Sequence, residues 1–344
     1  MTLPMQPPLE PMLAKAQTEI PTGGRWLYEP KWDGFRAIIF RDGDRLQIQS
    51  RNALPLERYF PDLIQPLLDG LPPKTVVDGE IVIAGEHGLE FDALQLRLHP
   101  AASRVKMLAE QTPASVVLFD MLALERRDLR REPLVDRRQR LFENLKATRT
   151  VGITPQTESA DEAGWWFERY EGAGLDGVVA KEKDGEYRHG QRGWIKVKHL
   201  RTVDVVVGGF RPLTKGEGIG SLLLGLYGDN GELHFVGHTS GFSAEERREI
   251  LARLEPLIGG ESFGHGRTPG GPSRWKREAD AAWTAVKPSL VCEVSFDHLQ
   301  GPRFRHAARF LRWRTDKKPK QCTFEQLAPP ERFALQDIVI APQG

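Results

Sequence analysis

A lysine with a distinctive set of neighbours lies near the start of the chain, in the segment EPKWDGFR at residues 29–36. Lys31 stands two residues before an Asp-Gly pair and five residues before Arg36. A lysine amine is a nucleophile only when it is deprotonated, and at pH 7 only about one unperturbed lysine in 2,500 is neutral. A site that uses such an amine needs burial or nearby positive charge, and Arg36 could supply the charge. Gly34 would allow a tight backbone bend beside a ligand.

Two carboxylates two residues apart form a second candidate group. Asp78 and Glu80 lie in the segment VVDGEIVI, and alternate residues of a strand face the same side. Their apolar neighbours indicate a core strand, in which paired acids need a metal ion or a cationic partner. Taken alone, the two acids could instead be a turn and a salt bridge, and Lys31 could be the exposed end of an ordinary strand.

Two lysines further along the chain have the same alternate spacing. Lys196 and Lys198 lie in WIKVK, and their shared face could grip a polyphosphate, while LDGVVAK adds Asp176 and Lys181. An acid pair suited to Mg²⁺ and a lysine cluster suited to phosphates favour phosphoryl or nucleotidyl transfer. The lysine pair by itself would more often be the solvated face of an edge strand.

Positive charge is concentrated in residues 301–320, although the formal net charge of the chain is only +1. Eight lysines and arginines there are opposed by Asp316 and are interleaved with Phe304, Phe310 and Trp313. Basic residues with aromatic neighbours suit a polyanion with stackable bases. A charge run without other support is more often a solvated tail.

The elements that must position these residues fall into two regions. The first 200 residues mix strand-like and helical segments, which predicts an α+β domain. From Asp204 onward come short strands with turn signals and one helix, opened by Ser243 with Glu246 three residues later, which predicts a small barrel. We place the boundary near residues 200–204, and we expect the Gly- and Pro-rich residues 259–277 to form a loop.

Composition limits the class of protein. With 40% hydrophobic and 28% charged residues the chain resembles soluble globular proteins, and 344 residues suffice for two domains. We find no signal peptide and no apolar stretch of membrane-spanning length, so we expect a cytoplasmic protein without membrane contact. The two cysteines, Cys292 and Cys322, form no CxxC pair, which argues against a zinc module and a disulfide framework.

Two further patterns are weaker. The segment KGEGIGS at residues 215–221 is glycine-rich, but the residues after it predict a strand, so we expect a hairpin turn rather than a phosphate loop. His234 and His238 have the spacing of a zinc-protease helix, but their segment predicts a strand and lacks the HExxH glutamate.

The motifs in this order resemble those of the covalent nucleotidyltransferase superfamily, and specifically the short, two-domain bacterial ATP-dependent DNA ligases of the C type. The resemblance covers nearly the whole chain, through KWDGFR, SRN, DGEIV, LFDML, DGVVAK, WIKVK and RFLRWRTDK. It implies an adenylation (nucleotidyltransferase) domain at residues 1–201 and a C-terminal OB-fold β-barrel at residues 202–344.

The resemblance also implies roles for individual residues. Lys31 would become the lysyl-adenylate, and Glu80 and Asp176 would contact Mg²⁺ or Mn²⁺. Many relatives have glutamate where this chain has Asp176, which puts the reach of that ligand in question. The last motif would orient the pyrophosphate leaving group and then swing away to admit DNA. The implied ATP- and AMP-binding residues are Glu29, Lys31, Arg36, Arg51, Glu80, Phe119, Lys181, Trp194, Lys196, Lys198, Arg314, Asp316 and Lys317.

The implied activity is the sealing of nicks in duplex DNA between 5′-phosphate and 3′-hydroxyl ends, with ATP as the nucleotide, in DNA repair. We expect a monomer, because no oligomer seam is visible, and no residue pattern identifies a repair polymerase or end-binding protein as a partner. Three alternatives remain: an RNA ligase, an mRNA-capping guanylyltransferase, and a non-catalytic nucleic-acid-binding scaffold. A scaffold would have no use for an activated lysine.

Overall fold

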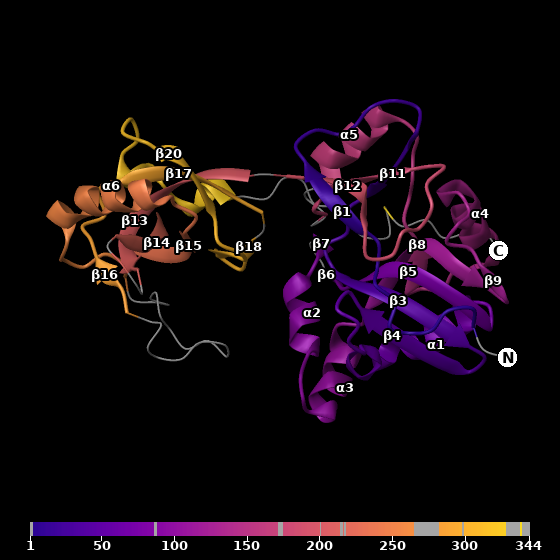
Figure 1. Cartoon of the computed structure of the whole chain (residues 1–344). Helices are drawn as coiled ribbons and strands as arrows, with labels where there is room; N and C mark the ends of the chain where they lie inside the picture. The colour runs from indigo at the N-terminus through magenta and orange to yellow at the C-terminus, as the bar shows by residue number, and fades with distance from the viewer. Residues whose placement is uncertain are drawn as a thin grey trace. The chain divides into compact units, whose positions relative to one another are not determined.

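The computed structural model describes residues 3–85, 88–170, 175–199, 201–213, 216, 218–264, 282–297, 299–327 and 338. The chain divides into two compact units, the first comprising Met1–His199 with Pro329–Gly344 and the second Leu200–Ala328 (Figure 1). The division falls beside the boundary expected from the sequence. Ile338, expected in the second domain and described in the structure, packs instead in a hydrophobic cluster with Trp32 and Val82 of the first unit. Among the described residues no helix is long and apolar enough to cross a membrane.

Two sheets form the frame of the first unit. In the first sheet β1 pairs with β12 in parallel and the other pairs are antiparallel; its order is β1 (Leu13–Gln17), β12 (Arg192–Lys198), β11 (Gly177–Glu182) and β2 (Trp26–Pro30). The second runs β10 (Val151–Ile153), β8 (Ser115–Leu124), β5 (Lys74–Val82), β3 (Phe35–Asp42) and β4 (Arg45–Ser50), with β9 (Arg127–Asp128) paired to β8. A small hairpin joins β6 (Ala84–Gly85) and β7 (Gly88–Leu89).

Helices cover these sheets, with α4 packed on β8 and α5 on β2 and β11 (Figure 1). They are η1 (Glu57–Tyr59), η2 (Pro61–Leu63), α1 (Ile64–Gly70), α2 (Phe91–Arg97), α3 (Ala102–Gln111), α4 (Leu134–Asn144) and α5 (Ala160–Arg169). The sequence of α4 predicts an apolar face with charges in solvent, and Leu134 and Leu141 are buried as expected. Arg137 is buried too, because its guanidinium makes two hydrogen bonds to the Asp120 carboxylate, at 2.8 and 2.9 Å.

A hydrophobic cluster joins the two sheets of the first unit. It includes Ile38 and Phe119 from the second sheet, Trp194 from β12, and Tyr187 from the loop that precedes β12. Burying each such side chain stabilises the fold by about 1.5–3 kcal/mol. This contact fixes the ends of β3, β5 and β8 beside those of β11 and β12, and the candidate site lies there.

The second unit is a barrel. Its main strands lie in the order β15 (Leu233–Thr239), β14 (Ile219–Tyr227), β13 (Arg201–Pro212), β17 (Val291–Phe296) and β20 (Arg309–Trp313), and a parallel bridge from Thr239 to Ala308 closes it. Shorter elements are α6 (Ala244–Leu254), η4 (Glu255–Leu257), β16 (Thr284–Ala285), β18 (Leu299–Gln300), β19 (Arg303–Phe304), η6 (Pro319–Gln321) and η7 (Phe324–Leu327). Five strands in this order, with a helix after the third, form an OB-fold barrel.

Local predictions for this unit agree with the structure where its residues are described. Ser243 and Glu246 form the predicted capping box of α6, and β13 and β14 form an antiparallel hairpin around the glycine-rich segment. His234 and His238 lie on β15, a strand rather than a helix. Lys215, Glu217 and most of the predicted loop at 259–277 lie outside the described residues. The α+β prediction is confirmed.

Candidate active site

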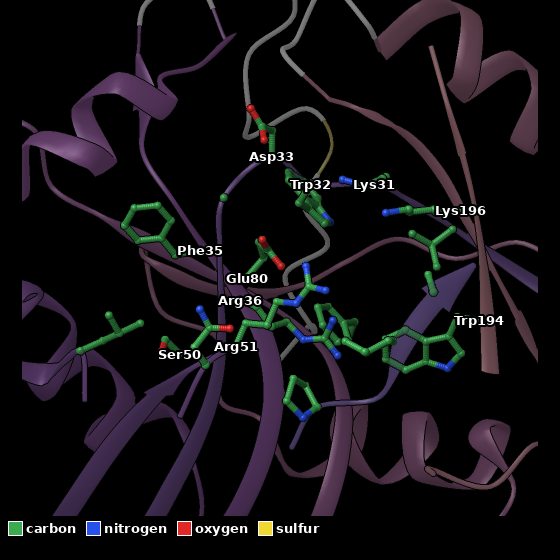
Figure 2. A pocket seen from close by; sticks show the side chains of 18 of the residues that line it. Lys31, Trp32, Asp33, Phe35, Arg36, Ser50, Arg51, Glu80, Trp194 and Lys196 are labelled. Atoms are coloured by element: carbon green, nitrogen blue, oxygen red, sulfur yellow. The ribbon is translucent and has the colours of Figure 1, made fainter. Parts of the chain in front are cut away.

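A cavity of about 790 Å³ in the first unit receives side chains from both sheets (Figure 2). Every residue of this unit that the sequence motifs assign to ATP or AMP lines it: Glu29, Lys31, Arg36, Arg51, Glu80, Phe119, Lys181, Trp194, Lys196 and Lys198. Asp176 lies at its edge, in contact with two of the lining lysines. The residues come from six separate segments between positions 29 and 198, so only the folded sheets bring them together.

Lys31 is held at both ends. It follows β2, and its backbone is tied by hydrogen bonds from Lys31 N to Gly177 O and from Asp176 N to Lys31 O, each 2.8 Å. Its Nζ lies 2.5 Å from Asp176 Oδ2, and the side chain is 19% exposed. The next residue, Trp32, is buried and donates to Thr154 Oγ1 at 2.8 Å. The backbone that carries the Lys31 amine is therefore fixed, and the side chain lines the cavity.

Gly34 is required for a reason other than the bend expected from the sequence. A Cβ at this position would lie 2.2 Å from the carbonyl oxygen of Ile81 and 2.8 Å from Glu80 Cγ. The chain after Lys31 thus crosses directly over β5, and only glycine leaves room for it. Gly177, next to Asp176, has φ +130° and would place a Cβ 2.0 Å from Val197 O, so the backbone behind Lys31 is equally tight.

Positive charge gathers on one side of the cavity. Lys198 Nζ lies 2.7 Å from the same Asp176 oxygen that contacts Lys31. Partial burial, together with the charges of Lys198, Lys31 and Arg51, lowers the pKa of Lys196. Figure 2 shows Lys31 and Lys196 on the same side of the pocket. Lys31, Lys196, Lys198 and Arg51 bring positive charge together around the Asp176 carboxylate, and such a group of cations favours a polyanion such as a polyphosphate.

The two acids of β5 have different surroundings. Asp78 is fully buried, and Arg36 contacts it through Nε at 2.5 Å and Nη2 at 2.6 Å, with the Tyr187 hydroxyl donating at 2.6 Å. Glu80 lies opposite Arg36 in the sheet and lines the cavity. Burial raises the pKa of Glu80 to about 7, against the opposing effect of Arg36 and Lys31. Asp78 therefore has its cationic partner, and Glu80 is the acid left facing the cavity.

Two aromatic rings and a buried pair of oppositely charged side chains form the deepest part of the site. Lys181 Nζ lies 4.2 Å from the centroid of Phe119 and 4.3 Å from that of Trp194, and 2.6 Å from Glu29 Oε2. The second oxygen, Glu29 Oε1, is buried and accepts no hydrogen bond within the described part of the chain. Arg138 Nε is 3.9 Å from it. A planar base with a hydrogen-bond donor on its edge fits these surroundings.

The remaining predicted residues lie in the second unit, after β20. Arg314 and Lys317 both contact Asp204, a buried residue of β13, and Asp316 pairs with Arg314. In the sequence Asp204 marks only the start of the second domain. No local signal links it to the last motif, because the contact joins positions 110 and 113 residues apart.

Two other residues of the site were also missed. Tyr187 supports Asp78 from a polar loop, where no pattern distinguishes it. Arg138 could have been found, since it lies four residues after Leu134, on the buried face of α4. For metal binding, the described residues contain no group of three or more His, Cys, Asp or Glu side chains.

Comparison with known proteins agrees with the motifs. Residues 11–198 match the family model of the ATP dependent DNA ligase domain, and residues 215–317 match that of the ATP dependent DNA ligase C terminal region. DNA ligase C1 of Mycolicibacterium smegmatis is 50% identical, covering 98% of this chain and 99% of the relative. DNA ligase C of Mycobacterium tuberculosis is 46% identical, with the same coverage.

A solved structure from a study of Lig E DNA ligases has a TM-score of 0.55 and 21% identity, and covers 88% of this chain and 99% of that one, which shows a common fold. The two domain matches span most of the sequence in the order that the structure shows. The chain belongs to the family of ATP-dependent DNA ligases.

Proposed function

We propose that Lys31 is the residue that carries AMP during nick sealing, and that the cavity around it is the ATP site. The observation that carries this proposal is the position of the Lys31 amine, 2.5 Å from Asp176 Oδ2 in a cavity that also contains Lys196 and Lys198. A nucleophile, a carboxylate within proton-transfer distance and a cluster of phosphate-binding cations are what lysine adenylation requires.

In the first step the Lys31 nitrogen attacks the α-phosphorus of ATP. The bond from that phosphorus to the pyrophosphate oxygen breaks, and pyrophosphate leaves with the electron pair. The amine loses a proton, which Asp176 Oδ2 is close enough to accept. Lys196 and Lys198 offset the negative charge that grows on the α-phosphate, as fixed charges in a partly desolvated site do efficiently.

The next two steps use DNA. AMP passes from Lys31 to the 5′-phosphate at a nick, with Arg51 beside the cavity as a contact for the ribose and that phosphate. The 3′-hydroxyl then attacks the activated phosphate, and AMP leaves. Contacts to DNA are made mainly with phosphates, so sealing has no sequence preference.

The base of ATP binds in the aromatic part of the cavity. Phe119 stacks on adenine beside Trp194, and Glu29 Oε1, which lacks a hydrogen bond within the described residues, accepts from the adenine amino group. Lys181 holds Glu29 in place. Guanine would present a carbonyl oxygen to Glu29, so we expect ATP to be preferred over GTP.

A divalent cation fits the site through Glu80. Mg²⁺ in phosphoryl-transfer sites is often held by one or two carboxylates together with substrate phosphates. Glu80 supplies one carboxyl group in the cavity, and Mg²⁺ or Mn²⁺ would neutralise polyphosphate charge there. Asp176 was the second predicted ligand, but its carboxylate contacts Lys31 and Lys198, so an ion there would compete with an ammonium group. We therefore assign Asp176 to the nucleophile and Glu80 to the metal ion.

Arg314, Asp316 and Lys317 complete the proposal, as residues of the last motif that orient pyrophosphate during adenylation. DNA repair is the proposed setting, because relatives that are 32% identical over 92% of this chain carry the name of a multifunctional end-joining DNA repair protein. This chain spans only 40% of that relative. The DNA substrate favours a cytoplasmic location, and we propose a monomer.

The test is transfer of labelled AMP from ATP to the protein, followed by sealing of a nicked duplex. Lys31→Ala should abolish both. Lys183→Ala is a matched control, because Lys183 also pairs with a carboxylate, Glu158 at 3.0 Å, but lies outside the cavity. Covalent AMP retained by the Lys31 variant would refute the assignment. Duplexes with a deoxyribose or a ribose at the 3′ end would then show which break is preferred.

A further inference from the structure

The two cations of the last motif share a single carboxylate inside the barrel. Arg314 Nη1 lies 2.9 Å from Asp204 Oδ1 and 3.0 Å from Oδ2, and Lys317 Nζ lies 2.7 Å from Oδ2. Asp204 is on the first strand of the barrel, β13, whereas Arg314 and Lys317 follow the last strand, β20. The carboxylate therefore joins the two ends of the barrel sequence at one point.

The surroundings of Asp204 make this a fixed anchor rather than a surface ion pair. The residue is 7% exposed. Its backbone is held by Gln326, which accepts from Asp204 N at 3.3 Å and donates to Asp204 O at 3.1 Å, and the same Gln326 accepts from Lys317 Nζ at 3.3 Å. Ion pairs with a rigid, buried partner order a side chain far better than exposed ones do.

Arg314 is constrained from two directions. Its Nε and Nη2 contact the Asp316 carboxylate at 2.9 and 2.8 Å, while Nη1 contacts Asp204. Because the guanidinium is planar, contacts on two of its edges set both its position and its orientation. Lys317, which has a flexible four-carbon stem, is directed by Asp204 and Gln326.

We propose that Asp204 is a positioning residue for adenylation, holding Arg314 and Lys317 as a preformed pair for the pyrophosphate group. This rests on the proposed role of the last motif in ATP chemistry. Long basic side chains lose conformational freedom when they bind a ligand, and ordering them beforehand removes that cost. Asp204 acts through Arg314 and Lys317, so its effect is confined to the step that releases pyrophosphate.

The experiment compares Asp204→Asn with wild type in two half-reactions of the full chain. One is single-turnover adenylation of Lys31 over a range of ATP concentrations, and the other is sealing of a nick that already carries AMP, without ATP. We expect the maximal adenylation rate to fall by about tenfold or more, with sealing of the adenylated nick within about twofold of wild type. Asp204→Glu should recover part of the adenylation rate.

Glu293→Gln is the matched control. Glu293 lies directly opposite Asp204 in the sheet and also binds an arginine, Arg312 at 2.6 Å, but neither Arg314 nor Lys317 donates a hydrogen bond to it among the described residues. We expect this variant to adenylate at the wild-type rate. In an Arg314→Ala/Lys317→Ala background, Asp204→Asn should cause no further loss, because a residue that acts through others is silent without them.

Three results would overturn the proposal: wild-type adenylation by Asp204→Asn, faster adenylation that marks Asp204 as a brake, or equal loss of both half-reactions. A different result would refute the proposed role of the last motif, on which this inference rests. If Arg314→Ala/Lys317→Ala itself adenylates normally, the last motif has no part in ATP chemistry, whatever Asp204 does.

Discussion

Lys31 and Lys198 share one oxygen atom: both ammonium nitrogens contact Asp176 Oδ2, at 2.5 and 2.7 Å. The Asp176 carboxyl group is almost fully buried, and the backbones of Asp176 and Lys31 are hydrogen-bonded to each other. A single side chain therefore places Lys31, the proposed nucleophile, beside Lys198, and its carboxylate also lies close enough to Lys31 to accept a proton.

Asp176→Asn should lower the rate of Lys31 adenylation by about a hundredfold or more, because the amide keeps the shape but loses the charge that holds both lysines. Asp176→Glu should retain part of the activity. Single-turnover transfer of labelled AMP measures this. Glu158→Gln, which removes the partner of Lys183, is the control and should adenylate normally. Wild-type rates for the Asn variant would mean that the carboxylate is dispensable.

Gly34→Ala should both destabilise the first unit and impair adenylation. Its Cβ would lie 2.2 Å from a backbone oxygen of β5, so the segment carrying Lys31 must shift. We expect a loss of about 2 kcal/mol or more in the free energy of unfolding and at least a hundredfold in the adenylation rate, by rough analogy with other strained or misplaced sites.

Gly164→Ala provides the contrast for that experiment. Gly164 lies inside α5, and the Cβ that alanine adds would have nothing within 4 Å, so alanine should stabilise the helix by about 1 kcal/mol. Urea unfolding of the two variants gives both values. Equal free energies of unfolding for Gly34→Ala and Gly164→Ala would show that the segment crossing β5 accommodates the added Cβ without loss of stability.

Asp120→Ala should be among the most destabilising changes in the first unit. It leaves the Arg137 guanidinium, which is 1% exposed, without its carboxylate, and such uncompensated burial costs about 3–5 kcal/mol. Asp128→Ala removes a similar arginine pair at the surface, with Arg130 at 2.7 Å, and should cost less than about 1 kcal/mol. Thermal unfolding compares them, and a small loss for both would show that Arg137 finds another partner.

Both cysteines should be inert in the folded protein. Burial raises the pKa of Cys322 to about 11 and that of Cys292 above its usual range. At pH 8 we expect alkylation by iodoacetamide to be at least about a hundredfold slower than in urea. Rapid native labelling would contradict the burial of these thiols.

The same shift predicts a pH dependence of stability. Between the ordinary thiol value and about pH 11, the unfolded chain loses the Cys322 proton while the folded chain retains it, so the free energy of unfolding should fall as pH rises through this range. Cys322→Ala should show a smaller decline, which urea unfolding at several pH values would measure.

Much of this protein is determined by the sequence alone. The alternation of polar residues on strands identifies which side chains share a face, and that was sufficient to group Lys196 with Lys198 and Asp78 with Glu80. The ordered motifs indicated the ligase family, the α+β first domain and the barrel. The capping residues Ser243 and Glu246 are local signals, so the start of α6 needed no tertiary information.

Only the tertiary structure determined which side chains and backbone segments contact each of these strand faces. The Arg36 side chain pairs with Asp78 rather than with its register partner Glu80, which is left in the cavity, although the two acids have the same spacing and chemistry. Close approach of β5, rather than backbone bending, explains Gly34, and Asp204 reaches Arg314 across more than a hundred residues. A side chain's periodicity follows from its own backbone, but its partner depends on how distant segments pack, which no local pattern contains.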